Sequence, residues 1–230
     1  MRVFVGTSGF SYDAWKGNFY PADLPSAKML AFYATQLSTV EINNTFYRMP
    51  TAKAVNGWGA QVPDGFKLVL KAPQRITHKK AFDESADGIA FFFQSAALLG
   101  DKLGPVLFQF PPWLKKDLAK LRAFLALPPK GHRLALEFRH ESWFDEETYE
   151  VLRGAEASLV VAETDDTPAQ LVSGGRFGYL RLRKTAYGPG ELEAWAQRVK
   201  AQPWEEAFVF FKHEDEGKGP AFAKQFSAFL

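Results

Sequence analysis

The sequence contains no cysteine, and only 4 of its 230 residues are histidine. Without a thiol the chain forms neither a disulfide nor a thiolate metal site, and a cysteine nucleophile is excluded. The absence fits a reducing compartment, so we expect a cytoplasmic protein. The scarcity of histidine leaves few candidates for a site built on several imidazoles.

Long apolar runs are also missing. No segment approaches the length that a membrane-spanning helix needs, and the run from Met1 to Thr7 is strand-like rather than a charged leader followed by an apolar core. We therefore expect no membrane partner and no export. Basic and acidic residues are nearly balanced, at 28 and 26, which argues against a nonspecific nucleic-acid coat over the whole surface. Any positive field must be local.

The chain is long enough for one sizeable core and too short for two comfortable ones, so we expect residues 1–230 to form one domain. Its pattern is an apolar stretch, a polar or aromatic exit, and then a helical pattern, repeated eight times. The predicted strands are Arg2–Gly9, Thr39–Asn43, Phe66–Lys71, Pro105–Phe110, the start of Arg133–Phe144, Ser158–Ala162, Tyr179–Arg183 and Ala207–Lys212. The predicted helices are about Ser26–Leu37, Thr51–Gln61, Ser85–Gly100, Asp117–Leu127, Asp145–Arg153, Glu191–Ala201 and Pro220–Leu230.

Strands that alternate with helices indicate a parallel sheet, and eight such units indicate an α/β fold of the TIM-barrel type, a closed (β/α)8 barrel. An open doubly wound sheet is the competing architecture. The barrel is favoured because no glycine-rich phosphate-binding fingerprint follows the first strand. The sixth unit has room only for a loop and one turn near Pro168–Leu171, so we expect it to be degenerate.

In such a barrel the site lies at the carboxyl ends of the strands. The stretch RLALEFRHESWF, Arg133–Phe144, shows the pattern most clearly, because its apolar residues alternate with a face that becomes charged toward the exit. Taking the less apolar face of each strand as the lumen predicts a polar group from every strand. These groups are Ser8, Glu41, Asn43, Lys71, Gln109, Glu137, Arg139, Glu163, Arg181, Arg183 and Lys212.

The predicted set contains more cations than carboxylates. Five basic side chains face Glu41, Glu137 and Glu163, so pairing does not neutralise them all. The open end of the barrel at the carboxyl ends of the strands, called the mouth below, should therefore attract a phosphate or carboxylate ligand. Glu137 is the preferred acid or base, although it serves equally well as an orienting ion-pair partner of Arg139 or Arg181. Lys71 is an amine nucleophile or electrophile if neighbouring cations depress its pKa, and otherwise an anion clamp.

Aromatic residues crowd the same strand exits. They either form a hydrophobic lid or stack on a sugar or a nucleobase. The second reading supports an alternative function, a barrel that binds or processes nucleic acid. These residues are Phe10, Tyr12, Trp15, Tyr20, Phe46, Tyr47, Trp113, Trp143 and Phe144.

A third function is a divalent-metal-dependent isomerase or hydrolase. His140 and His213 lie near strand exits, and with Glu137, Glu163 and Asp215 they offer nitrogen and oxygen ligands for Mg or Mn. No ligand spacing identifies a metal site, so we assign no metal ligand and regard no cofactor as clearly implied.

Four motifs in order resemble the YecE-like family of proteins of unknown function. They are GTSGFSYDAWKGNFYP at Gly6–Pro21, VEINNTFYRMP at Val40–Pro50, LGPVLFQFPPWL at Leu103–Leu114 and LALEFRHESWF at Leu134–Phe144. The resemblance covers essentially the whole chain and implies a TIM-barrel-like fold, but no established activity. Its signature positions fall on Gly6, Ser8, Tyr12, Trp15, Glu41, Asn43, Phe46, Tyr47, Gln109, Pro111, Glu137, Arg139 and Trp143. Many members carry an Asn-rich turn after the last strand, where this chain has Phe211-Lys212-His213-Glu214, so a role for the Lys212-His213 exit is in doubt.

The leading prediction is a barrel enzyme for a small anionic substrate, phosphorylated or sugar-like. Glu137 and Lys71 are the expected catalytic residues. The expected substrate-binding residues are Arg139, Arg181, Arg183, Glu41, Asn43, Gln109, Ser8, Tyr12, Trp15, Tyr47 and Trp143. The sequence leaves the substrate, the reaction and the oligomeric state open.

Overall fold

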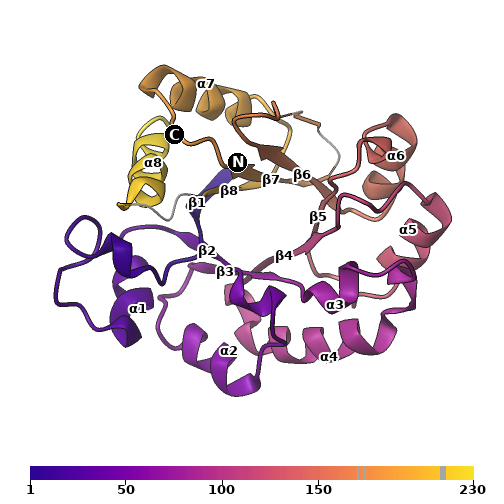
Figure 1. Cartoon of the computed structure of the whole chain (residues 1–230), viewed down its shortest axis with the longest axis horizontal. Helices are drawn as coiled ribbons and strands as arrows, with labels where there is room; N and C mark the ends of the chain where they lie inside the picture. Colours follow the sequence, from indigo (N-terminus) through magenta and orange to yellow (C-terminus); the bar gives the residue numbers. More distant parts are fainter. Residues whose placement is uncertain (170, 173–174, 213–215) are drawn as a thin grey trace.

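Eight parallel strands close into one barrel, in chain order, in a computed structural model that describes residues 1–169, 171–172, 175–212 and 216–230 (Figure 1). The last strand pairs with the first, Thr7 lying opposite Phe211. The predicted TIM-barrel fold is therefore confirmed. The strands are β1 (Arg2–Ser8), β2 (Thr39–Ile42), β3 (Lys67–Lys71), β4 (Leu103–Gln109), β5 (Leu134–Glu137), β6 (Ser158–Glu163), β7 (Phe177–Leu182) and β8 (Glu206–Phe211).

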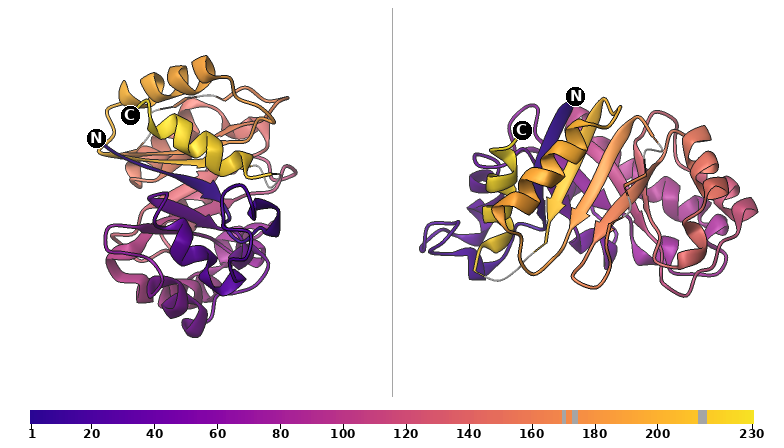
Figure 2. Two further views of the ribbon diagram at one scale, coloured as in Figure 1. Left: turned by 90° about the vertical axis from the view of Figure 1, so that its left-hand side faces the viewer. Right: turned by 90° about the horizontal axis from the view of Figure 1, so that it is seen from above.

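Helices surround the barrel, and the strands run obliquely inside them (Figure 2). The α-helices are α1 (Met29–Tyr33), α2 (Ala52–Gly59), α3 (Gln74–Thr77), α4 (Ala86–Ala96), α5 (Leu118–Leu125), α6 (Glu146–Gly154), α7 (Pro189–Lys200) and α8 (Lys218–Ser227). Short 3-10 helices occupy Asp13–Trp15, Ser26–Lys28, Asn44–Phe46, Phe82–Glu84, Ala97–Lys102 and Glu141–Trp143. Asp117 and Asp145 begin α5 and α6 as predicted, because each carboxylate accepts a hydrogen bond from a backbone N–H in the first turn.

The strands alternate between two apolar cores. One lies between the barrel wall and the helices, and the other fills the lumen. The lumen core contains Phe4, Val69, Leu107, Ala135, Val160, Phe177, Tyr179, Phe208 and Phe210. Since strand residues alternate between faces, the residue two positions after Val69, Leu107, Ala135 or Tyr179 also faces the lumen, one layer nearer the carboxyl end.

Three local predictions need correction or comment. The helix expected over Ser26–Leu37 is a 3-10 turn followed by the short α1, because residues 35–37 form tight turns that lead the chain back into β2. The loop expected after β3 contains the one-turn helix α3. Among the described residues between β6 and β7 no helix forms, so the sixth unit is degenerate as predicted. The turn expected over Pro168–Leu171 falls partly outside the described residues.

No described helix combines the length and the apolar character that crossing a membrane requires.

Candidate functional site

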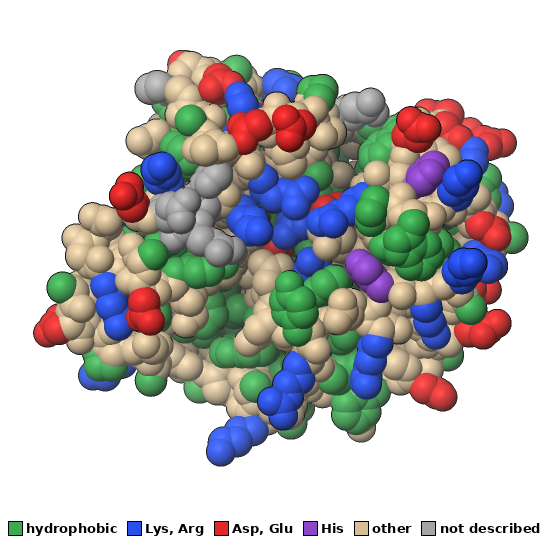
Figure 3. All heavy atoms as spheres, viewed as in Figure 1, with side chains coloured by type: hydrophobic (Ala, Val, Ile, Leu, Met, Phe, Trp, Pro, Cys, Tyr) green, Lys and Arg blue, Asp and Glu red, His purple; other side chains and the backbone are tan. Residues whose placement is uncertain are grey.

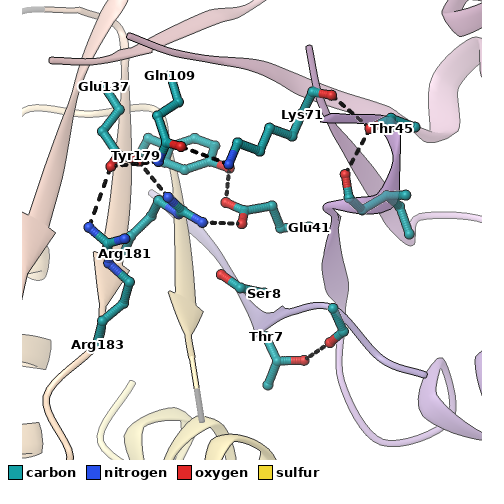
Figure 4. A network of polar contacts seen from close by, with 12 residues as sticks. Thr7, Ser8, Glu41, Thr45, Lys71, Gln109, Glu137, Tyr179, Arg181 and Arg183 are labelled. Atoms are coloured by element: carbon teal, nitrogen blue, oxygen red, sulfur yellow. Dashed lines mark hydrogen bonds and ion pairs between the residues drawn. The ribbon is translucent and has the colours of Figure 1, made fainter. Parts of the chain in front are cut away.

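A layer of polar side chains covers the apolar lumen at the carboxyl ends of the strands (Figure 4). Lys71, Gln109 and Glu137 are the last residues of β3, β4 and β5, each two positions beyond an apolar lumen residue. Ser8 ends β1 and pairs in register with Glu41 of β2. Arg181 comes from β7, across the lumen. The strand ends therefore bring together residues that are far apart in the sequence, as predicted.

Arg181 lies at the centre of this layer and is almost fully buried. Its Nη1 donates to Glu137 Oε2 at 2.5 Å, and its Nη2 donates to Glu41 Oε1 at 2.7 Å. The Tyr179 hydroxyl donates to the other oxygen of Glu41 at 2.6 Å. Burial alone raises the pKa of Glu41, but the Arg181 charge and the Tyr179 hydrogen bond hold that pKa below its usual value.

Glu137 is shared by several donors. Besides Arg181, its Oε1 accepts from Gln109 Nε2 at 2.8 Å and lies 3.4 Å from both Arg139 Nε and Arg183 Nη2. Burial raises the pKa of Glu137, but Arg181, Arg183 and Arg139 together outweigh burial and lower the pKa to about 2. The predicted ion pairs with Arg139 and Arg181 are confirmed. A carboxylate with so low a pKa is a weak base, so this environment favours the orienting role of Glu137.

Lys71 is the amine of the layer. Its Nζ donates to Gln109 Oε1 at 2.8 Å and lies 3.9 Å from the centre of the Phe46 ring. The Thr45 hydroxyl, 2.7 Å from the Lys71 carbonyl oxygen, holds the turn that carries Phe46 against the end of β3. Burial, and next the charge of Arg181, lower the pKa of Lys71 to about 8. The predicted depression of this pKa is present, with burial as its largest cause.

The layer carries an excess of positive charge. Among the described residues, Lys71, Arg139, Arg181 and Arg183 face the carboxylates of Glu41 and Glu137 and no others. In the space-filling view, basic side chains gather at the centre of the face, inside the ring of strands and next to a hollow (Figure 3). Arg139 and Arg183 are the outermost of these residues, with 39% and 18% of their side chains exposed. Their guanidinium groups are therefore the most accessible of these basic groups from the solvent side of the mouth.

Several buried polar atoms in this region lack a hydrogen-bond partner among the residues that the structure describes. They are Ser8 Oγ, Asn43 Oδ1, Arg181 Nε and Arg183 Nε. Ser8 Oγ lies close enough to Glu41 to help lower its pKa, although not in hydrogen-bonding geometry. Buried donors and acceptors are normally satisfied by protein, water or ligand, so unpaired atoms at a strand-end layer indicate a place for a polar guest.

The predicted ligand contacts of Trp15 and Trp143 are wrong, whereas those of Tyr12 and Tyr47 stay predictions. Trp15 and Trp143 are 1% and 0% exposed, because both belong to the core between the barrel and its helices, and neither presents a face for stacking. Tyr12 packs on Trp15 and donates its hydroxyl to the Ser8 carbonyl oxygen, so it stabilises the loop after β1. Tyr47 is 78% exposed but lies outside the lumen. The nucleic-acid alternative thereby loses its two tryptophans, while nucleic acid as a partner stays a prediction.

Two predicted lumen residues also need correction. Glu163 belongs to β6 but points toward α7, where it accepts hydrogen bonds from Tyr187 Oη at 2.7 Å and Trp195 Nε1 at 3.2 Å. Ala162, its neighbour, takes the lumen face instead. Lys212 follows β8 and is exposed rather than buried in the lumen.

The metal alternative gains no cluster from the structure. Within residues 1–169, 171–172, 175–212 and 216–230, no three His, Asp or Glu side chains lie together in a way that would hold an ion. His213 and Asp215, two of the predicted ligands, fall outside the described residues. His140, another of them, has its Nδ1 2.9 Å from the Ser142 hydroxyl.

Two residues of the mouth were not predicted. Tyr179 follows from strand alternation, since it lies two positions before Arg181 and therefore on the same face. His78 had no such signal, because it follows the unpredicted helix α3. Its ring packs edge-on against Phe46, with centroids 5.1 Å apart, and burial, then Lys71 and Arg139, lower its pKa.

A separate hollow of about 990 Å³ lies beside the mouth, between the start of α2, α3 and α4. Tyr47, Phe91 and Leu98 line it, and Arg48 and Arg75 are its charged residues. Phe46 separates it from Lys71, since its ring contacts the amine and also lines the hollow. The candidate site is the mouth rather than this hollow, because none of the residues that line the hollow belongs to the buried polar layer.

We expect Lys71→Met to raise the free energy of unfolding by about 1–2 kcal/mol at pH 7. Removing the buried ammonium should stabilise the fold by more than the lost hydrogen bond to Gln109 destabilises it. The pKa of Lys71 is lower in the folded chain than its ordinary 10.5, so the buried ammonium destabilises the fold below about pH 8. The gain should shrink as the pH rises from 8 to 10.5. Urea denaturation at pH 7 and pH 10 measures both effects.

Lys102→Met is the matched control. Lys102 donates to the carbonyl oxygens of Gly59 and Val62, so its loss should destabilise the chain. If the parent were more stable than Lys71→Met at pH 7, the buried Lys71 ammonium would not destabilise the fold, and the prediction would be wrong.

Comparison with known sequences matches residues 4–230 to the family described as "Protein of unknown function DUF72". The UPF0759 protein YunF of Bacillus subtilis is 32% identical over 158 residues, covering 64% of this chain and 54% of that protein. The UPF0759 protein YecE of Escherichia coli is 30% identical over 143 residues, covering 62% and 50%. The chain thus spans about half the length of the curated relatives it matches.

Two solved structures resemble the whole barrel. A crystal structure of a DUF72 family protein from Thermotoga maritima matches with a TM-score of 0.86 and 27% identity, covering 100% of this chain and 99% of that one. A DUF72 family protein from Enterococcus faecalis matches with a TM-score of 0.80 and 20% identity, covering 99% and 95%. The second likeness concerns the fold alone.

Proposed function

This chain belongs to the family described as "Protein of unknown function DUF72", and from the site that it carries we propose an enzyme that acts on a small anionic substrate at the carboxyl-terminal mouth of the barrel. The substrate is a small anion, phosphorylated or sugar-like. The absence of cysteine supports a cytoplasmic setting for this activity.

The observation that carries this proposal is the crowding of guanidinium groups around one carboxylate oxygen. Glu137 Oε1 already accepts from Gln109 at 2.8 Å, while Arg139 and Arg183 reach it only at 3.4 Å. The buried Arg183 Nε has no acceptor in the described part of the chain. Because Arg139 and Arg183 make only these long contacts, their guanidinium N–H groups can donate hydrogen bonds to a ligand. The planar guanidinium group matches the spacing of phosphate and carboxylate oxygens.

The remaining groups divide between support and chemistry. Arg181 is committed to Glu41 and Glu137, so it holds the layer together and does not reach for substrate. Gln109 links Glu137 to Lys71. Lys71 is the group with reactive potential, because burial lowers its pKa to about 8 and its amine therefore loses a proton more readily than an ordinary lysine does.

Inorganic phosphate, sulfate and small sugar phosphates should stabilise the protein against heat, and Arg183→Met should weaken that binding about tenfold or more. The arginine supplies a charge-assisted hydrogen bond that methionine lacks. Thermal shifts across an anion titration give the affinity, and Arg139→Ala should weaken it as well. Arg122→Met, on the exposed face of α5, is the matched control and should bind like the parent.

The absence of any shift with every anion tested would remove the proposal. Equal binding by the parent and both mouth variants would move the anion site elsewhere.

A further inference from the structure

The Lys71 amine occupies an unusual position for a lysine. The residue is 7% exposed, and its Nζ has one hydrogen-bond acceptor, Gln109 Oε1. Among the described residues no carboxylate comes within ion-pairing distance of this nitrogen. Buried ammonium groups are normally paired, so the surroundings of Lys71 support the neutral amine, whose lone pair is free when one N–H is given to Gln109.

Two polar atoms at the ends of β1 and β2 are unsatisfied. Ile42 pairs with Leu70, so Asn43 and Lys71 follow side by side at the ends of β2 and β3, and Ser8 ends the next strand. Among the described residues, Asn43 Oδ1 and Ser8 Oγ have no hydrogen-bond partner. Both atoms are therefore left to bond with a ligand at the ends of β1 and β2.

The amine is connected to the anion-attracting arginines. Gln109 bonds to Lys71 on one side and to Glu137 Oε1 on the other, each at 2.8 Å. The same Glu137 oxygen is the one that Arg139 and Arg183 approach. A short molecule whose acid group binds Arg139 and Arg183 would therefore extend past Glu137 and Gln109 toward the Lys71 amine.

We propose that Lys71 forms an imine with the carbonyl carbon of a short substrate that also carries a carboxylate or a phosphate. This inference rests on the proposed function, because the arginines hold the anionic end. It adds the substrate class, a 2-oxo acid or a phosphorylated aldehyde or ketone, and assigns the covalent step to one atom, Lys71 Nζ.

The step balances within the two reactants. The Nζ lone pair attacks the carbonyl carbon, a C–N bond forms, and one proton moves from nitrogen to the carbonyl oxygen to give a carbinolamine. The hydroxyl then leaves with the second nitrogen proton as water, and the C=N bond forms. Lys71, with a pKa of about 8, holds about 300 times more neutral amine at neutral pH than a lysine at 10.5.

Reductive trapping tests the proposal on the full chain. Pyruvate, glyoxylate and dihydroxyacetone phosphate are each added with cyanoborohydride, which reduces a C=N bond to a stable amine, and the adduct is located by mass spectrometry of peptides. We expect one adduct on Lys71 and a rate that saturates with substrate. Comparing the two acids with the phosphate shows which anionic group the mouth takes.

Three comparisons complete the design. Lys71→Arg keeps the charge and removes the nucleophile, so it should lose the adduct while still binding phosphate. Lys120→Arg, which changes a partly exposed lysine on α5, should trap like the parent. Dihydroxyacetone without a phosphate should react at least about tenfold more slowly, since it lacks the group that Arg183 binds.

The outcomes separate the two proposals. Arg183-dependent anion binding without a Lys71 adduct overturns the imine and leaves the anion site standing. Adducts spread over surface lysines, or unchanged in Lys71→Arg, also overturn the imine. Failure of both anion binding and trapping removes both proposals.

Discussion

Replacing Arg181 with methionine should lower the free energy of unfolding by about 3–5 kcal/mol at neutral pH, or prevent folding. The substitution keeps the volume but leaves Glu41 and Glu137 as two buried carboxylates without their shared guanidinium. Equilibrium urea denaturation of the parent, of Arg181→Met and of the control Arg122→Met measures the difference.

The pH dependence of this difference has a definite sign. In the parent the pKa of Glu137 is about 2, below its ordinary 4.5, so its stabilising contribution is complete above about pH 4.5 and is lost as the pH falls toward 2. Without Arg181, burial raises the pKa of both carboxylates, so as the pH falls they become protonated at a higher pH than in the parent. The gap between parent and variant should therefore narrow as the pH falls below about 5.

A second substitution tests the cause. Arg181→Met combined with Glu41→Gln should recover part of the lost stability, because it removes one of the uncompensated charges and keeps an acceptor for the Tyr179 hydroxyl. Equal stability of the parent and Arg181→Met at pH 7 would show that the ion pairs do not support the fold.

Trp143→Ala should cost about 3–5 kcal/mol of stability, as expected for a large side chain removed from a closed core. Its ring is fully buried and stacks on Phe138 at 4.3 Å between centroids, and Phe138 in turn stacks on Phe110 at 5.2 Å. Its Nε1 donates to the Leu114 carbonyl oxygen at 2.7 Å. Thermal and urea denaturation give the loss.

Trp113→Ala is the matched control, since Trp113 is 50% exposed and its removal should change stability by no more than about 0.5 kcal/mol. The two variants also distinguish an effect on stability from an effect on binding. Loss of ligand binding in Trp143→Ala would follow from a damaged core, whereas loss of binding in Trp113→Ala would indicate a nucleobase stacked on the exposed ring. A Trp143→Ala protein as stable as the parent would contradict the structural role assigned to this ring stack.

The sequence by itself determined the barrel and most of its polar mouth. Strand residues alternate between two faces, so the apolar pattern of Val69 and Leu107 already places Lys71 and Gln109 in the lumen. The same rule places Glu137 and Arg181 there, and parallel strands must expose these ends on one side. Tyr179 was within reach of this reasoning too, since it shares the alternation of Arg181.

Only the tertiary structure decided which groups pair and which remain open. Glu163 continues a strand whose lumen face belongs to Ala162, and Trp15 and Trp143 turn into the core, because a loop or strand end is placed by what packs against it rather than by its neighbours in sequence. Arg181 bonds to carboxylates from β2 and β5 because closing the barrel brings these strands across from β7. Charge and distance are properties of the closed ring, and they give Arg139 and Arg183 only long contacts with Glu137 while Lys71 bonds to Gln109.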